Sequence, residues 1–244
     1  MFDIEFLGHF PGFDFGSTPG LVEQYLLRTS HGFARTTSPR LFLPADPVSE
    51  ADLVLHSLQG RMDMLDGFVG GSSPIKSLGV ADSQLDDPDG FIRSMFVANM
   101  QAGNLHKSSV APGELFVNPG VSYVEAFGTQ EDADGCLSFS GLVLLARRWR
   151  VIDIWGLGRT VSREVDTVAF ILQHEWDHLF GIPCMQRRVP GTPIFFVPPE
   201  VRTLFFEQFF YTGRMMEWPY QLPGDSWLEA MAFLDMFCEP YRQN

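Results

Sequence analysis

The sequence contains Gln173-His174-Glu175-Trp176-Asp177-His178, in which two histidines stand four residues apart. On a helix, residues four apart lie one above the other on the same face, so His174 and His178 can bind one metal ion. Glu175 then lies within reach of a water molecule beside that ion. The spacing predicts a metallohydrolase that uses an activated water. The alternative is a helix whose two histidines are only packed or solvated.

The residues around this stretch predict a buried helix over 166–181. Its apolar residues recur near a 3.6-residue period, at Val168, Ala169, Ile171, Leu172, Leu179 and Phe180. Asp166 or Thr167 can cap the start, and Gly181 followed by Pro183 is a stop signal. Buried imidazoles and carboxylates are costly unless they are hydrogen-bonded or bound to a cation, so a metal ion explains this polar cluster.

Two histidines do not complete a catalytic metal site, which usually has three protein ligands. No histidine follows His178, but Glu200 and Glu207 lie in a plausible helix over 199–207 and would complete a site of the metalloprotease kind. The upstream candidate is Cys136, because a thiolate binds zinc or ferrous iron and its neighbour Gly135 allows close backbone approach. The residues alone leave both ligand sets open.

Three blocks in this order resemble peptide deformylase. They are Gly-Val-Ala-Asp-Ser-Gln at 79–84, Gly-Cys-Leu-Ser at 135–138 and Gln-His-Glu-Trp-Asp-His-Leu-Phe-Gly at 173–181. The resemblance covers roughly residues 40 to 190. It implies that Cys136, His174 and His178 bind one divalent metal ion, with Fe2+ expected and Zn2+ as the alternative. It also implies that Glu175 is the general base.

The activity that the resemblance implies is removal of the N-formyl group from N-formylmethionyl peptides, with release of formate. Glu175 would take a proton from water and pass it to the leaving amine. The Gln84 side-chain amide and the Leu137 backbone N–H would stabilise the oxyanion. Substrate would contact Gly79 and a methionine-sized pocket, for which the candidates are Val80, Phe170 and Ile171. Core packing explains these three apolar residues equally well.

Three departures from the deformylase pattern leave other functions open. Ser77 stands in place of glycine, Asp82 in place of alanine and Asp134 in place of glutamate. Asp82 points either toward the substrate channel or away from it. Asp134 would pair with Arg148 as an outer-shell contact, unless the arginines of 147–150 form a solvated strand face. The alternatives are therefore a deformylase-like protein with lost or altered activity and a His-Glu-x-x-His metalloprotease with a downstream glutamate ligand.

The charge of the chain restricts its partners. Its 244 residues include 17 basic and 30 acidic ones, and the net charge of −13 argues against nucleic acid or an anionic membrane as a partner. No run of 18 apolar residues predicts a membrane span. The expected partner is an N-formylmethionyl peptide or the N-terminus of a nascent chain.

The three cysteines are too few and odd in number for a disulfide scaffold, and a metal-binding thiolate favours a reducing compartment. Cys184 and Cys238 are expected to be small core residues. Acidic residues in the first 30 positions oppose a targeting peptide. We expect the cytoplasm if the protein is bacterial and an organelle, the mitochondrion, if it is eukaryotic.

The expected architecture is α+β, with antiparallel β-sheets packed around a central metal-binding helix. A helix is predicted over 49–66, and strands over 78–80, 91–99, 115–117, 121–127, 142–145 and 151–155. Residues 1–40 would form an N-terminal extension, 41–190 the catalytic domain, and 191–244 an aromatic-rich C-terminal extension packed on the same domain. Aromatic residues of that last segment are expected in the core or at the interface of a homo-oligomer.

Overall fold

The computed structural model describes residues 39–49, 63, 78–85, 91–100, 109–139, 141–197, 202–219 and 221–222. Apart from its first residue and residue 63, the helix predicted over 49–66 lies outside these ranges. The chain divides into two compact units. We call residues 38–132 and 146–189 the helix unit, and residues 1–37, 133–145 and 190–244 the aromatic unit.

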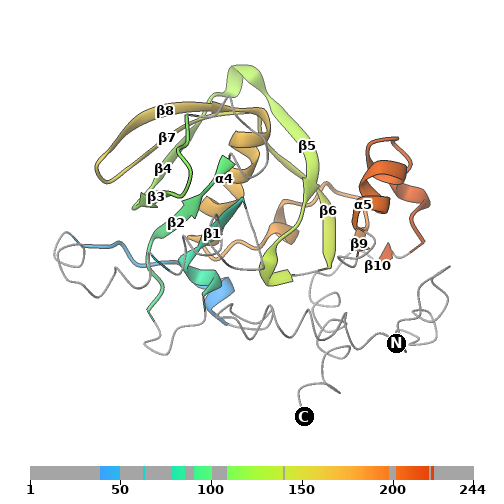
Figure 1. Cartoon of the computed structure of the whole chain (residues 1–244), viewed down its shortest axis with the longest axis horizontal. Coiled ribbons are helices and arrows are strands. Elements are labelled where there is room, and N and C mark those ends of the chain that lie inside the picture. The colour runs from blue at the N-terminus through green and yellow to red at the C-terminus, as the bar shows by residue number, and fades with distance from the viewer. Residues whose placement is uncertain are drawn as a thin grey trace, which may run out of the picture. The chain divides into compact units, whose positions relative to one another are not determined.

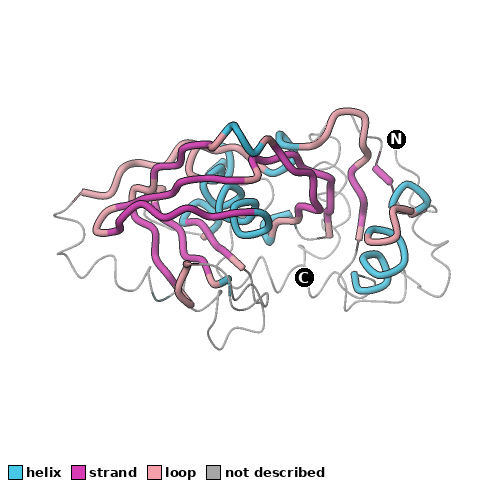
Figure 2. Tube along the Cα trace, turned by 90° about the horizontal axis from the view of Figure 1, so that it is seen from above, coloured by secondary structure: helices cyan, strands magenta, loops and turns pink. Residues whose placement is uncertain are grey.

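The helix unit contains two antiparallel three-stranded sheets and one long helix. The first sheet has the order β1-β2-β3, formed by Gly79–Ala81, Met95–Ala98 and Glu114–Val117. The second has the order β4-β7-β8, formed by Gly120–Tyr123, Val151–Gly156 and Arg159–Val165. Helix α4, Asp166–His178, packs against β1, β2, β7 and β8 (Figure 1). Seen from above, α4 lies among the strands of this unit (Figure 2).

The core of the helix unit joins the helix to both sheets. Ala169 and Leu172 of α4 are fully buried with Phe96 of the first sheet and with Ile152 and Ile154 of the second. Alternate residues of a strand face the same side, so these positions form one apolar surface per sheet. Burial of each large apolar side chain contributes about 1.5–3 kcal/mol, and this packing fixes the helix in place.

The ends of α4 differ in part from those predicted. The N-cap residue is Val165, and no side-chain hydrogen bond caps the helix. The expected cap by Asp166 or Thr167 is therefore wrong: Asp166 has a positive φ of 49°, and its carboxylate instead accepts a 2.8 Å hydrogen bond from Arg150. The predicted stop is confirmed, because Gly181 has a φ of +67° and its N–H donates to the His178 carbonyl.

The aromatic unit has a small core of its own. Strand β9, Ile194–Phe196, pairs with β10, Gln221–Leu222, and helix α5, Arg202–Phe205, continues into a π-helical turn over Phe206–Phe210. Phe205 and Trp218 are buried with their rings 5.1 Å apart, and the Trp218 indole N–H donates to the Phe196 carbonyl. Core packing therefore accounts for these two aromatic residues.

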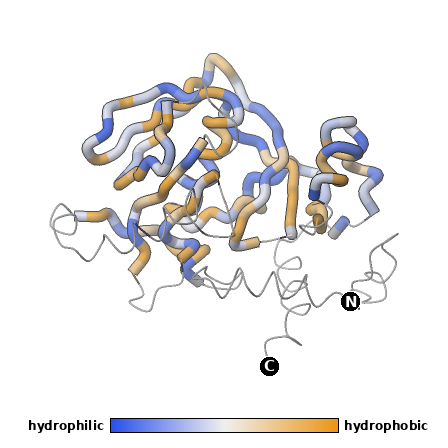
Figure 3. Tube along the Cα trace, in the orientation of Figure 1, coloured by the Kyte–Doolittle hydropathy of each residue, from blue (hydrophilic) through white to orange (hydrophobic). Residues whose placement is uncertain are grey.

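A third sheet has the order β10-β9-β6-β5. Its strands β5, Thr129–Asp134, and β6, Leu142–Trp149, are the places where the chain passes between the units. Strand β5 is largely hydrophilic and β6 largely hydrophobic (Figure 3).

The predicted strands are confirmed with shifted ends, except that β4 stops at Tyr123. The second half of the predicted strand over 121–127 is wrong. Glu125–Phe127 form a 3-10 turn there, closed by Gly128 with a φ of +67°. The predicted α+β class with antiparallel sheets is confirmed. Within the described ranges, no helix is long and apolar enough to cross a membrane.

Candidate metal centre

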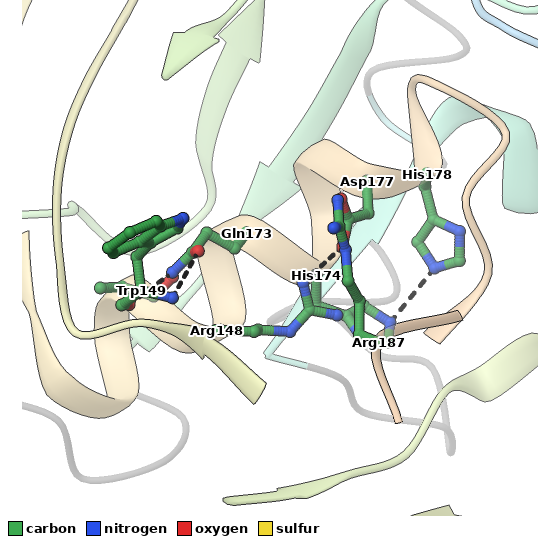
Figure 4. A network of polar contacts seen from close by, with 8 residues as sticks. Arg148, Trp149, Gln173, His174, Asp177, His178 and Arg187 are labelled. Atoms are coloured by element: carbon green, nitrogen blue, oxygen red, sulfur yellow. Dashed lines mark hydrogen bonds and ion pairs between the residues drawn. The ribbon is translucent and has the colours of Figure 1, made fainter. Parts of the chain in front are cut away.

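Helix α4 presents its polar residues on two neighbouring faces. His174 and His178 are four residues apart and share one face, while Gln173 and Asp177 share the next. All four side chains are buried. Figure 4 shows the two histidine rings turned toward each other and the Gln173 and Asp177 side chains engaged with other elements.

The histidine pair has a geometry that suits one metal ion. The two Nε2 atoms are 3.2 Å apart, and the ring centroids are 4.8 Å apart at an interplanar angle of 79°. Two nitrogens that each lie about 2.0–2.1 Å from one tetrahedral zinc ion are roughly 3.3 Å from each other. The observed separation fits that requirement.

Cys136 lies between the end of β5 and a 3-10 turn formed by Leu137–Phe139. The turn closes when the Phe139 N–H donates to the Cys136 carbonyl. A Cβ added to Gly135 would lie 3.3 Å from Arg202 Nη2 and 3.4 Å from the Leu142 carbonyl oxygen, so the predicted close backbone approach at Gly135 stays a prediction. Cys136 itself is buried.

Among the residues that the structure describes, Cys136, His174 and His178 are the group of cysteine, histidine and carboxylate side chains that could hold a metal ion. Their ligand atoms all lie within 4.8 Å of one another. One thiol and two imidazoles form a donor set that suits zinc or ferrous iron. Glu207 is exposed and is not part of this group, and Glu200 lies outside the described ranges.

Glu175 is buried beside β1, and Gly79 makes room for it. A Cβ added to Gly79 would lie 2.5 Å from Glu175 Cγ and 2.7 Å from both Cδ and Oε1. A side chain at position 79 therefore cannot coexist with this arrangement of Glu175. The sequence suggested that Gly79 contacts substrate, and the structure adds a second reason for a glycine.

The turn after β1, residues Asp82–Gln84, carries the predicted oxyanion donor. Gln84 Oε1 accepts a 2.8 Å hydrogen bond from the Ala81 N–H, which turns the amide NH2 group away from Ala81. Ser83 Oγ donates to the carbonyl oxygen of His178, 3.4 Å away. The turn is thus hydrogen-bonded to the C-terminal end of the helix that carries both histidines.

Asp82 has its own partners inside the helix unit. The side chain is fully buried, and Oδ2 accepts a 2.8 Å hydrogen bond from the Arg93 N–H. The Arg40 guanidinium lies 3.7 Å from the same oxygen. Of the other departures from the deformylase pattern, Asp134 is buried and Ser77 lies outside the described residues.

Asp177 is an important residue that the sequence did not reveal. Its carboxylate binds Arg187 through two hydrogen bonds of 2.5 and 2.9 Å, and Arg148 through one of 2.5 Å (Figure 4). Hydrogen bonding to Asp177 raises the pKa of Arg187. Arg148 is therefore buried and paired, and the idea of a wholly solvated arginine face over 147–150 is wrong. The predicted contact of Arg148 with Asp134 stays a prediction.

Gln173 fastens α4 to the end of β6. Its amide accepts from the Trp149 N–H at 3.0 Å and donates to the Trp149 carbonyl at 2.8 Å (Figure 4). A cavity of about 220 Å³ adjoins this contact. Its lining comprises Tyr123, Thr129, Arg147, Arg148, Trp149, Gln173, Asp177 and Arg187. Burial, and next the charge of Asp177, raise the pKa of Tyr123.

The three candidates for an apolar pocket have different surroundings. Val80 and Phe170 are buried, and the Arg148 guanidinium lies over the Phe170 ring, 5.2 Å from its centroid. Ile171 is partly buried and packs against the core cluster of the helix unit. Leu137 is partly buried at the start of its turn.

Comparison with solved structures reveals the same fold in peptide deformylases. The enzyme of Synechococcus elongatus, in complex with actinonin, is 20% identical at a TM-score of 0.52, over 65% of this chain and 80% of that one. The Thermotoga maritima enzyme is 22% identical at a TM-score of 0.51, over 65% and 97%. An Acinetobacter baumannii class I type b enzyme is 22% identical at a TM-score of 0.51, over 64% and 97%.

No curated protein sequence matches the chain. The sequence model of the polypeptide deformylase family, by contrast, matches residues 35–192, which is more than half of the chain. The antiparallel sheets and few helices described above agree with that match. The chain belongs to the polypeptide deformylase family.

Proposed function

We propose that this protein is a metal-dependent hydrolase that removes the N-formyl group from N-formylmethionyl peptides and releases formate. The observation that carries the proposal is the grouping of one cysteine thiol and two histidine nitrogens within 4.8 Å of one another, in a member of the deformylase family. A buried glutamate, Glu175, immediately follows the first histidine. The substrate is a formylated peptide or the N-terminus of a nascent chain.

Cys136, His174 and His178 would hold one divalent ion. Both imidazoles must then offer an unprotonated Nε2, so the contact between these two nitrogens would give way to bonds to the ion. A divalent ion in this donor set supplies Lewis acidity that lowers the pKa of water toward neutrality. We propose Fe2+ as the native metal, with Zn2+ as the alternative, because both accept a thiolate and two imidazoles.

Glu175 would act as the general base. It takes a proton from the attacking water and returns it to the amine nitrogen as the bond to the formyl carbon breaks. Its burial beside Gly79 of β1 supports this role, because only a residue without a side chain leaves room for Glu175 there. The Gln84 amide NH2 and the Leu137 N–H would donate to the oxyanion, each contributing about 2.7–4 kcal/mol.

The methionine side chain would bind among Val80, Phe170 and Ile171, with Gly79 in contact with the peptide. The partial exposure of Ile171 supports this assignment best. Outside the metal centre, Asp134 and Arg148 would hold the neighbouring backbone, and the buried state of both supports a structural contact.

Residues 41–190 would form the catalytic domain, in agreement with the family match over 35–192. Residues 1–40 and 191–244 would be extensions. Association into a homo-oligomer through the aromatic C-terminal segment stays a prediction, which the exposure of Tyr211 in the described part of that segment supports.

Formate release from a formyl-Met peptide tests the proposal, with metal content measured on the same preparation. We expect turnover by the wild-type protein loaded with Fe2+ or Zn2+, and its loss in Glu175→Gln with the bound metal retained. A protein that binds one metal ion per chain but releases no formate would instead support the alternative of a deformylase-like protein without this activity.

A further inference from the structure

The residue that departs most clearly from the deformylase pattern is also one of the most buried polar residues. Asp82 replaces an alanine of that pattern, yet its side chain has no exposed surface. A buried carboxylate is unfavourable unless charges or hydrogen bonds compensate it. Other residues of this chain must therefore supply that compensation.

Two such partners are present on the same carboxylate oxygen. The Arg93 N–H donates to Asp82 Oδ2 at 2.8 Å, and the Arg40 guanidinium lies 3.7 Å from it. Arg40 is itself nine-tenths buried and donates from Nη2 to the Phe91 carbonyl at 2.8 Å. Arg40 and Asp82 therefore join the segment over 39–42, the turn over 82–84 and the segment over 91–93.

The segments that meet at Asp82 are held firmly on their other sides. The Asp46 backbone N–H donates to the Ile92 carbonyl, and the Ser94 N–H donates to the Asp46 carbonyl. Gly181, at the end of α4, packs so closely on Phe42 that an added Cβ would lie 2.6 Å from its carbonyl carbon and oxygen. The carboxylate thus ties the 82–84 turn to a fixed frame.

Every side chain of the turn has a separate contact. Asp82 binds the frame, Ser83 donates to the His178 carbonyl, and Gln84 accepts from the Ala81 N–H. A three-residue turn has little freedom, so displacement at Asp82 must move Gln84 two positions later. An error of about 1 Å at a catalytic group can cost roughly 10²-fold in rate.

We propose that Asp82 and Arg40 are positioning residues of the deformylase reaction, which act by orienting the Gln84 amide toward the oxyanion. The inference rests on the proposed function, because it needs Gln84 as an oxyanion donor. It also gives a role to Arg40, the last residue of the predicted N-terminal extension. On this proposal, Arg40 and the Arg93 N–H offset the cost of burying the Asp82 carboxylate, and the side chain points away from the substrate channel.

The test uses the full chain, loaded with metal, and a formyl-Met peptide. The variants are Asp82→Ala, Asp82→Asn, Arg40→Met and the double variant Arg40→Met/Asp82→Ala. We expect Asp82→Ala to lower kcat by roughly 10- to 100-fold with KM unchanged, because the oxyanion forms only in the transition state. Asp82→Asn keeps an acceptor for the Arg93 N–H, so a smaller loss is expected. The double variant should recover part of the activity, because neither charge is left alone.

Two further measurements separate positioning from general destabilisation. In a Gln84→Ala background, Asp82→Ala should cause no further loss of kcat, since its effect passes through Gln84. Amide hydrogen exchange at Ala81 should accelerate in Asp82→Ala and Arg40→Met, and to a smaller extent in Asp82→Asn, because the Ala81 N–H is bound to Gln84 Oε1. Asp153→Asn is the matched control: it removes the charge of the Asp153–Arg163 pair on β7 and β8 and should leave kcat, KM and Ala81 exchange unchanged.

The outcomes distinguish this inference from the proposed function. If the wild-type protein turns over substrate and folded Asp82→Ala or Asp82→Asn keeps the wild-type kcat, the inference is overturned and the proposed function stands. The same holds if the losses of kcat in Asp82→Ala and Gln84→Ala multiply in the double variant. Absence of wild-type turnover would refute the proposed function, and the positioning contact is then judged by Ala81 exchange. Exchange that stays at the wild-type rate in Asp82→Asn and Arg40→Met would refute the contact. If Asp82→Ala does not fold, these two variants carry the test.

Discussion

The close approach of Gly79 and Glu175 gives a sharp prediction about Glu175, the proposed general base. In Gly79→Ala, the new Cβ would lie 2.5 Å from Glu175 Cγ, whereas carbon atoms in ordinary contact are about 3.5–4.0 Å apart. Something must therefore move by roughly 1 Å. Gly79 is paired with Ala98 in the first sheet, and α4 is fastened to Trp149 through Gln173, so the Glu175 side chain is the part that yields.

Two magnitudes follow from this displacement. Overpacking of this size costs about 1–3 kcal/mol of folding free energy. Displacement of the base by about 1 Å lowers kcat roughly 10²-fold. The three heavy atoms nearest to the new methyl group all belong to Glu175, and none belongs to His174 or His178. The metal content should therefore stay at the wild-type value.

The assay is formate release as a function of formyl-Met peptide concentration, together with thermal unfolding and metal analysis. Gly158→Ala is the control, because Gly158 has a φ of +73° with nothing within 4 Å of its added Cβ. It should lose about 1–2 kcal/mol of stability from backbone strain but no activity. A folded Gly79→Ala protein with wild-type kcat would refute the reasoning. A raised KM with unchanged kcat would mean that Gly79 acts on substrate alone.

Three other substitutions test the surroundings of α4. Asp177→Ala removes a buried carboxylate that pairs with Arg148 and Arg187, and should lower the free energy of unfolding in chemical denaturation by about 3–5 kcal/mol. Cys136→Ala should lower the bound metal measured by elemental analysis, whereas Cys184→Ala should not. The raised pKa of Tyr123 stabilises the fold below the ordinary pKa near 10, and this contribution is lost as pH rises through the raised value. Tyr123→Phe should therefore weaken the pH dependence of stability above about pH 10 in alkaline unfolding experiments.

Helix α4 was predictable because several local signals agree. Its apolar period, its glycine stop and its paired histidines all point to one buried helix, and the helix forms over 166–178. Its cap was not predictable, because Arg150 competes for the Asp166 carboxylate from outside the helix. A side chain with two possible partners takes the one that the tertiary structure brings closer.

Strands β5 and β8 were missed because their sequences are polar. Residues 129–134 read Thr-Gln-Glu-Asp-Ala-Asp, and β8 alternates exposed positions with a buried Glu164. Strand formation depends on neighbours more than on intrinsic preference. The cross-strand pair of Asp153 and Arg163 supports β8. No local sequence pattern in residues 153 or 163 and their neighbours predicts this pairing.

The roles of Asp82 and Asp177 depended on arginines that are distant in sequence. Asp82 meets Arg40 across 42 positions, and Asp177 meets Arg148 across 29. Both carboxylates occur in motifs where they could equally have faced solvent. Charge alone could not decide this, because only the fold determines which guanidinium reaches which carboxylate.

Neighbouring residues of α4 divide two tasks between them. His174, Glu175 and His178 are the residues proposed for the chemistry, whereas Gln173 and Asp177 fasten the helix to β6 and Arg187. A reactive group is most effective when its own position is fixed by surrounding contacts. Because each anchoring residue directly precedes a histidine, loss of an anchor would rotate or shift the adjacent imidazole. The hydrogen bonds of Gln173 and the ion pairs of Asp177 therefore add to the apolar packing that holds this helix, on the face next to the one that carries the histidines.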